Sequence, residues 1–264
     1  MIKYAVHQAL RGRWGYAIWV CILPALPLFI LGMIPVSQTF GVVYVSIAGI
    51  YTRAYSLPLL AVGTLAAWLV VNPMLVKVSG YFVQLNRDPG QLPSPLSVCS
   101  CFGQGSGYFR LVRGMFVRDI IVWVAMLLPL AIGALIPGVI TVVPFEDVMA
   151  YRIDTVASWL LLLGSVFGLM VSMALSMVPY ILAEDPQVRT LEALRASRVI
   201  TRGRVGELFV LQLSLLGWNF LTQFIGQVTG FPVYNPFIEA TMAAYYIAYT
   251  QPSPLPEVQS DAAG

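Results

Sequence analysis

The chain has 264 residues, of which 58% are hydrophobic and only 10% are charged. A soluble domain carries about 25% charged residues, so a single soluble core of this length would have too little charge for its surface. The apolar residues occur in blocks of about 20, which match the roughly 30 Å hydrocarbon thickness of a bilayer. The composition therefore excludes a typical soluble protein and predicts an all-α, polytopic membrane protein.

The apolar blocks predict a six-span transmembrane helical bundle in a single membrane domain over residues 1–250, followed by a disordered cytoplasmic tail at 251–264. The spans are predicted at about 15–35, 57–77, 117–140, 157–181, 208–228 and 235–250. Residues 37–56 are moderately apolar but contain Gly41, Gly49 and Arg53. This pattern favours an extracytoplasmic loop lying on the bilayer over a seventh span, and an interfacial helix stays open for the segment.

The basic residues predict the orientation of these spans. With the N-terminus in the cytoplasm, 13 of the 15 Lys and Arg residues lie on the inner side, and only Arg53 and Arg152 lie outside. Basic residues resist translocation and collect on the cytoplasmic side. With six spans, this orientation predicts that both termini lie in the cytoplasm.

A basic cluster stands directly before the fifth predicted span. Its members are Arg195, Arg198, Arg202 and Arg204. An arginine at the bilayer centre costs about 2.5–3.5 kcal/mol, whereas one beside anionic headgroups gains about 1 kcal/mol. We expect a short helix over residues 186–201 at the inner interface, with its arginines on lipid headgroups. An ordinary connecting helix that is basic by composition is an equal alternative.

Small residues recur every four positions in the fourth predicted span. They are Gly164, Gly168, Ser172 and Ser176. This spacing places them on one helix face, where small side chains let another helix approach closely. The pattern predicts a buried helix contact.

Polar residues form a stripe in the fifth predicted span, at Gln212, Asn219 and Gln223. Amides in hydrocarbon need partners, and Glu239 in the sixth span is a candidate. An acidic residue in a span is a functional hypothesis by default. The favoured alternative is that Glu239 lies shallow, is reached by water and caps the first turn of its helix.

The sequence offers no constellation for catalysis. His7 is the only histidine, so a histidine-based metal cluster or triad cannot form. Cys99 and Cys101 fall in a predicted cytoplasmic loop, where free thiols are expected rather than a disulfide. We therefore expect no enzyme activity, no cofactor and no metal.

Several segments resemble one bacterial family of integral membrane proteins, the domain-of-unknown-function family 975. They are ALRGRWG (9–15), LIPGVI (135–140), VPYILAEDP (178–186), EALRASRVITRGR (192–204), SLLGWNFL (214–221) and PFIEATMAAYY (236–246). The family is distantly similar to membrane domains attached to glycerophosphodiester phosphodiesterases. The resemblance implies a multi-pass protein of the bacterial plasma (inner) membrane, and it supplies no catalytic residue.

These observations predict a non-catalytic membrane module that binds lipids or partner proteins. The expected partners are the bilayer and its anionic inner-leaflet lipids, with a partner membrane protein or a homo-oligomer as further candidates and no nucleic acid. The alternative is a small permease or transporter subunit that moves a small solute or ion, based on the polar stripe and Glu239.

Overall fold

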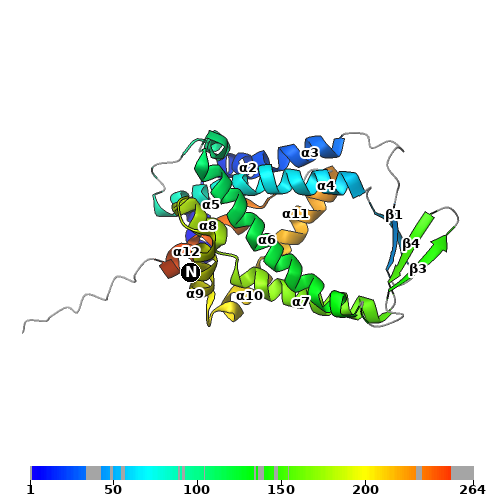
Figure 1. Ribbon diagram of the computed structural model, residues 1–264. Coiled ribbons are helices and arrows are strands. Elements are labelled where there is room, and N and C mark those ends of the chain that lie inside the picture. The colour runs from blue at the N-terminus through cyan, green and yellow to red at the C-terminus, as the bar shows by residue number, and fades with distance from the viewer. Residues whose placement is uncertain are drawn as a thin grey trace, which may run out of the picture.

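A computed structural model of the chain describes residues 2–33, 43–47, 50–54, 57–88, 90, 93–103, 105–133, 135, 140–145, 148–153, 155–229 and 234–250. Helices dominate, which confirms the helical class (Figure 1). The α-helices are α1 (Ile2–Leu10), α2 (Trp14–Ile22), α3 (Leu26–Met33), α4 (Leu57–Ala66), α5 (Asn72–Arg87), α6 (Ser106–Gly133), α7 (Thr155–Ala174), α8 (Val178–Glu184), α9 (Thr190–Thr201), α10 (Val205–Ser214), α11 (Leu216–Thr229) and α12 (Pro236–Thr250). Shorter helical segments are η1 (Leu23–Ala25), the π-helix η2 (Ala67–Val71) and η3 (Pro95–Gly103).

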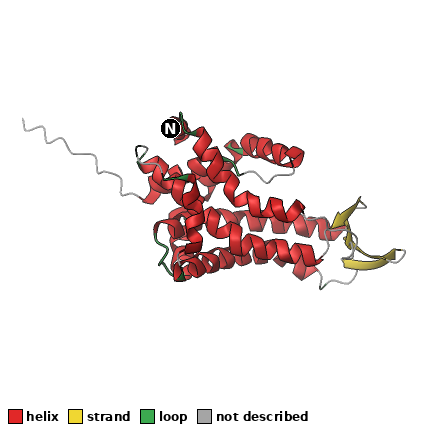
Figure 2. Cartoon of the chain, turned by 90° about the horizontal axis from the view of Figure 1, so that it is seen from above, coloured by secondary structure: helices red, strands yellow, loops and turns green. Residues whose placement is uncertain are grey.

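A small sheet, which the sequence analysis did not predict, joins two of the connections between helices. β1 (Val43–Ile47) and β2 (Ile50–Ala54) form an antiparallel hairpin, as do β3 (Ile140–Phe145) and β4 (Val148–Ile153). β1 pairs in parallel with β4, so the strand order is β2-β1-β4-β3. Strands therefore occupy much of the segment 37–56, where a loop or an interfacial helix was expected. Figures 1 and 2 show the sheet at the end of the helices opposite the N-terminus.

Three described helical stretches are long and apolar enough to cross a membrane: Val62–Arg87, Ser106–Gly133 and Trp159–Glu184. A fourth candidate is the bent pair Val205–Ser214 and Leu216–Thr222, whose axes differ by 50°. Trp14–Ala25 is a shorter apolar helix, and α12 with its 15 residues spans about 22 Å at 1.5 Å per residue. Length and composition thus support three or four spans, and six spans stay a prediction.

Large apolar side chains remain exposed along the candidate spans. Examples are Trp123 on α6, Trp159 on α7 and Phe224 on α11, which are 54%, 66% and 67% exposed. Soluble proteins rarely expose contiguous apolar patches larger than a few hundred Å². A surface of this kind is suited to hydrocarbon, so the chain is a membrane protein.

The buried core lies at the end of the bundle that carries the N-terminus, called the core end below. There α1, α5, α8 and α12 pack together, with η3 and the start of α6 beside them (Figure 1). Phe82 of α5, Leu182 of α8 and Ala243 of α12 are fully buried in this core. The sheet end has the long hairpin of α6 and α7, whose helices pack along each other.

A proline explains the irregular segment before α5. Pro73 has no N–H for the carbonyl of Leu69 four residues earlier, and the chain widens into the π-helix η2 at this point. The hydroxyl of Tyr108 on α6 donates a hydrogen bond to the Leu69 carbonyl. The interrupted helix is thus tied to α6 at its break.

The glycines of the predicted packing face lie against α6. A Cβ at Gly164 would overlap the Met126 carbonyl oxygen, and one at Gly168 would lie 3.0 Å from the Met126 Cβ. Ser172 is half-buried, and the Ser176 hydroxyl bonds the Met173 carbonyl at 2.8 Å.

We predict that Gly164→Ala lowers the melting temperature in detergent, because the new Cβ forces α6 and α7 apart. Overpacking of this kind costs about 1–3 kcal/mol. The matched control is Gly217→Ala on α11, whose Cβ would meet nothing within 4 Å. Equal melting temperatures for the two variants would contradict the close α6–α7 contact.

Candidate functional site

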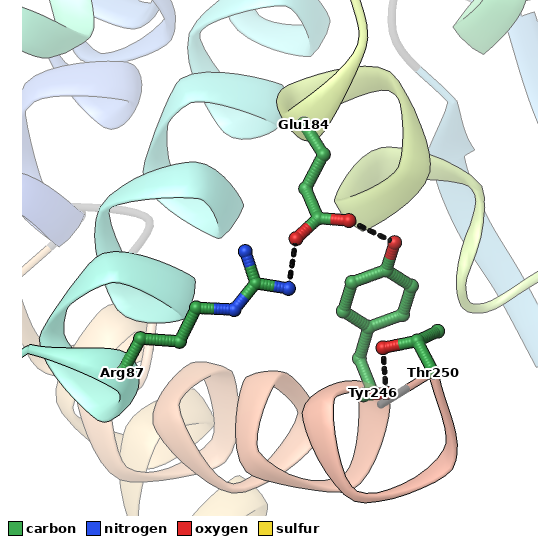
Figure 3. Close-up of polar contacts among 4 residues, drawn as sticks. All are labelled: Arg87, Glu184, Tyr246 and Thr250. Carbon is green, nitrogen blue, oxygen red and sulfur yellow. Dashed lines mark hydrogen bonds and ion pairs between the residues drawn. The ribbon is translucent and has the colours of Figure 1, made fainter. Parts of the chain in front are cut away.

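Two charged side chains pair where α5 and α8 end. The guanidinium of Arg87, the last residue of α5, forms an ion pair with the carboxylate of Glu184, the last residue of α8. The second carboxylate oxygen of Glu184 accepts a hydrogen bond of 2.6 Å from the hydroxyl of Tyr246 on α12 (Figure 3). Close by, the Asn86 amide donates to the Ala240 carbonyl at 3.2 Å. Three helices are thereby joined at the core end.

A cleft of about 420 Å³ opens beside this ion pair. Its lining residues are Gly80, Val83, Gln84, Arg87, Ala183 and Glu184. The side chains of Arg87 and Glu184 are 39% and 29% exposed, so both are accessible from the cleft. A Cβ at Gly80 would lie 3.2 Å from the Ala183 Cβ, which shows how closely α5 and α8 approach beneath it.

Glu239 forms a second polar contact within the bundle. Asn235 caps α12, since its side-chain oxygen accepts a hydrogen bond of 2.9 Å from the Phe237 N–H. The Glu239 carboxylate instead accepts a hydrogen bond of 3.1 Å from the Tyr180 hydroxyl of α8. The Tyr180 ring stacks on that of Tyr246, with the centroids 5.7 Å apart. The two polar contacts are therefore neighbours.

A third polar group lies on the candidate spans of α5 and α6. The Asn72 amide donates a hydrogen bond of 2.7 Å to the Asp119 carboxylate, and the Arg118 guanidinium lies 3.1 Å from the other oxygen of that carboxylate. Sequence reasoning counted Arg118 among the basic residues of the inner side and missed this pairing. The only local signal was the polar Asn72 within an apolar run.

The predicted amide stripe is divided by the bend between α10 and α11. Gln212 is half-buried on α10, whereas Asn219 is exposed on α11. The side chain of Gln223 lies outside the described part of the structure. Among the described hydrogen bonds, the Glu239 carboxylate is bonded by Tyr180 rather than by either amide.

The arginine cluster lies on and just after α9. Arg195, Arg198 and Arg202 are exposed, and Arg204 is half-buried. The Arg204 guanidinium stands 4.0 Å above the centre of the Tyr249 ring, a favourable cation–π contact. The exposed cluster therefore comprises the three arginines of the α9 surface.

Helix α9 is held in place by a carbonyl freed at the end of α7. The N–H of Val178 bonds the Leu175 carbonyl rather than that of Ala174. The Ala174 carbonyl instead accepts hydrogen bonds from the hydroxyls of Ser197 at 2.9 Å and Thr201 at 3.2 Å. The opposite face of α9, with its arginines, is left exposed.

The three cysteines differ in exposure. Cys21 and Cys101 are buried and Cys99 is half-buried, and all three are free thiols. Within the described residues, no group of three or more His, Cys, Asp or Glu side chains is arranged to hold a metal ion. The three thiols are therefore expected to differ in reactivity. Within the described residues they belong to no metal centre.

The apolar helices, their exposed hydrophobic surface and the paired polar groups between them define a helical integral membrane protein. The chain belongs to the family described as "Protein of unknown function (DUF975)", whose model matches residues 1–253. No curated protein and no solved structure matches the chain. The distant similarity to glycerophosphodiester phosphodiesterase membrane domains stays a prediction.

We predict that an alkylating maleimide modifies Cys99 before Cys101. Burial raises the pKa of the Cys101 thiol, so less of the reactive thiolate is present near neutral pH. Mass spectrometry of the peptides would follow the modification, and the Cys101 rate should keep rising toward higher pH. Faster modification of Cys101 than of Cys99 near neutral pH would contradict the placement of η3.

Proposed function

We propose that this protein is a non-catalytic module of the bacterial inner membrane that binds anionic lipid headgroups through α9, with both termini in the cytoplasm. The supporting observation is the exposed α9 surface, where Arg195, Arg198 and Arg202 stand beside Leu191 and Val199, which are 63% and 71% exposed. A helix with this face lies in the interface, with apolar side chains toward the acyl boundary and cations on headgroups.

Anchoring contacts support this orientation of α9. Ser197 and Thr201 direct its other face toward α7, and the Arg113 guanidinium reaches the Thr190 hydroxyl at its start, at 3.2 Å. Arg195, Arg198 and Arg202 outnumber the exposed acid Glu192 on this surface, so a net positive charge is left for lipid. A partner membrane protein or a second copy of the chain fits the same surface and is the outcome expected if lipid binding fails.

Replacing Arg195, Arg198 and Arg202 together with glutamine should weaken phosphatidylglycerol binding by tenfold or more, since each surface cation contributes about 1 kcal/mol. Native mass spectrometry of the purified protein titrated with phosphatidylglycerol measures this. The control is Arg53→Gln with Arg152→Gln, the two basic residues predicted on the outer side. Unchanged phosphatidylglycerol binding by the triple variant would refute the proposed lipid contact.

A small permease is a second candidate, favoured by the Glu239–Tyr180 hydrogen bond inside the bundle. A protonatable group at this position is typical of coupled transport. The adjacent Asn72–Asp119–Arg118 group adds further polar atoms between candidate spans.

In this case Glu239→Gln should reduce proton flux into proteoliposomes to the level of protein-free vesicles, because the amide cannot take up a proton. A pH-sensitive dye trapped inside the vesicles reports the flux under an imposed potassium diffusion potential. The control is Glu207→Gln, which removes an exposed acid hydrogen-bonded by Tyr249 at 3.0 Å. Flux that persists at the wild-type rate removes Glu239 from any such mechanism.

A further inference from the structure

The cleft beside Arg87 and Glu184 lies where two candidate spans end. One stretch runs from Val62 to Arg87 and the other from Trp159 to Glu184, with 26 residues each, so the ion pair stands at one end of both. At 1.5 Å per residue each stretch is about 39 Å long, which extends beyond the roughly 30 Å hydrocarbon core to the level of the lipid headgroups. At about 420 Å³ the cleft is also within the size range of small-ligand sites, roughly 300–1,000 Å³.

The charges lining the cleft favour one class of ligand. Arg87 and Glu184 supply one cation and one anion. A simple anion would therefore be repelled by Glu184, and a simple cation would be repelled by Arg87. A zwitterion satisfies both. A guanidinium has five donors and binds phosphate in bidentate fashion. A carboxylate accepts about four hydrogen bonds, and Arg87 and Tyr246 are the two described partners of Glu184.

We propose that this cleft binds the headgroup of an ethanolamine phospholipid, with its phosphate on Arg87 and its primary ammonium on Glu184. The ammonium donates three hydrogen bonds, whereas the trimethylammonium of a choline lipid donates none. Gln84 adds an exposed amide at the rim. The site is separate from the α9 surface and selects a zwitterionic rather than an anionic lipid, so it stands whether or not α9 binds lipid.

Native mass spectrometry of the full-length protein in detergent, titrated with phosphatidylethanolamine or phosphatidylcholine, tests the proposal. The wild type should prefer the ethanolamine lipid by about tenfold, the factor expected for a hydrogen bond to a charged group. Glu184→Gln should abolish the preference. Equal affinity of the wild type for the two lipids would overturn the proposal.

A second variant avoids disturbing the contacts of Glu184 with Arg87 and Tyr246. Gln84 is exposed, so Gln84→Trp fills the cleft while both contacts remain. It should weaken phosphatidylethanolamine binding by about tenfold with an unchanged melting temperature. Arg195→Gln, on α9, should keep the full preference. Undiminished binding by Gln84→Trp would overturn the proposal.

A competition experiment identifies the source of the headgroup. Soluble O-phosphoethanolamine carries the same two charges without acyl chains. It should displace the lipid only at concentrations far above those of phosphatidylethanolamine, because the chains contribute apolar burial. Displacement at equal concentration would overturn the assignment to a phospholipid in favour of a free metabolite.

Discussion

A backbone carbonyl that loses its helical partner inside hydrocarbon has no water to bond, and this constraint organises the fold. The Leu69 carbonyl, opposite Pro73, is bonded by the Tyr108 hydroxyl. The Ala174 carbonyl at the end of α7 is bonded by Ser197 and Thr201. These two breaks in candidate spans are therefore also joints, the first between η2 and α6 and the second between α7 and α9.

The same constraint sorts the polar side chains. Several inside the bundle are paired, as Asn72 is with Asp119 and Tyr180 with Glu239, whereas the buried Tyr81 hydroxyl on α5 has no hydrogen-bond partner among the described residues. The ion pair of Arg87 and Glu184 stands where two spans end, and it is half-exposed beside a cleft. Exposed charge is carried by α9, whose Ser197 and Thr201 hydroxyls bond the Ala174 carbonyl on its opposite face. Position relative to the hydrocarbon thus decides whether a polar group serves the structure or is available to a ligand.

Sequence reasoning reached the membrane class, the helical fold and the helix at the arginine cluster, because all three depend on local composition and periodicity. It placed the third span at 117–140, whereas α6 runs from Ser106 to Gly133. The apolar run begins only after Arg118, whereas the helix already begins at Ser106. Hydropathy indicates which residues contact lipid and does not give the length of the helix.

The missed features depend on distant pairing. The parallel β1–β4 contact joins separate loops, although strands of Val, Ile, Tyr and Thr carry a local preference for β structure. The Asn72–Asp119 and Tyr180–Glu239 hydrogen bonds join residues 47 and 59 positions apart. The prediction of an amide stripe assumed a straight helix through Leu215, where the structure bends by 50°. No single-sequence pattern reports such contacts.

The most direct test of the central claim is sedimentation velocity of the purified protein after its detergent is removed. A surface matched to hydrocarbon should aggregate in buffer and regain a single monodisperse species when lipid nanodiscs are supplied. A folded monomer that persists in plain buffer would mean that water solvates the exposed faces of α6, α7 and α11, and the membrane account would be wrong.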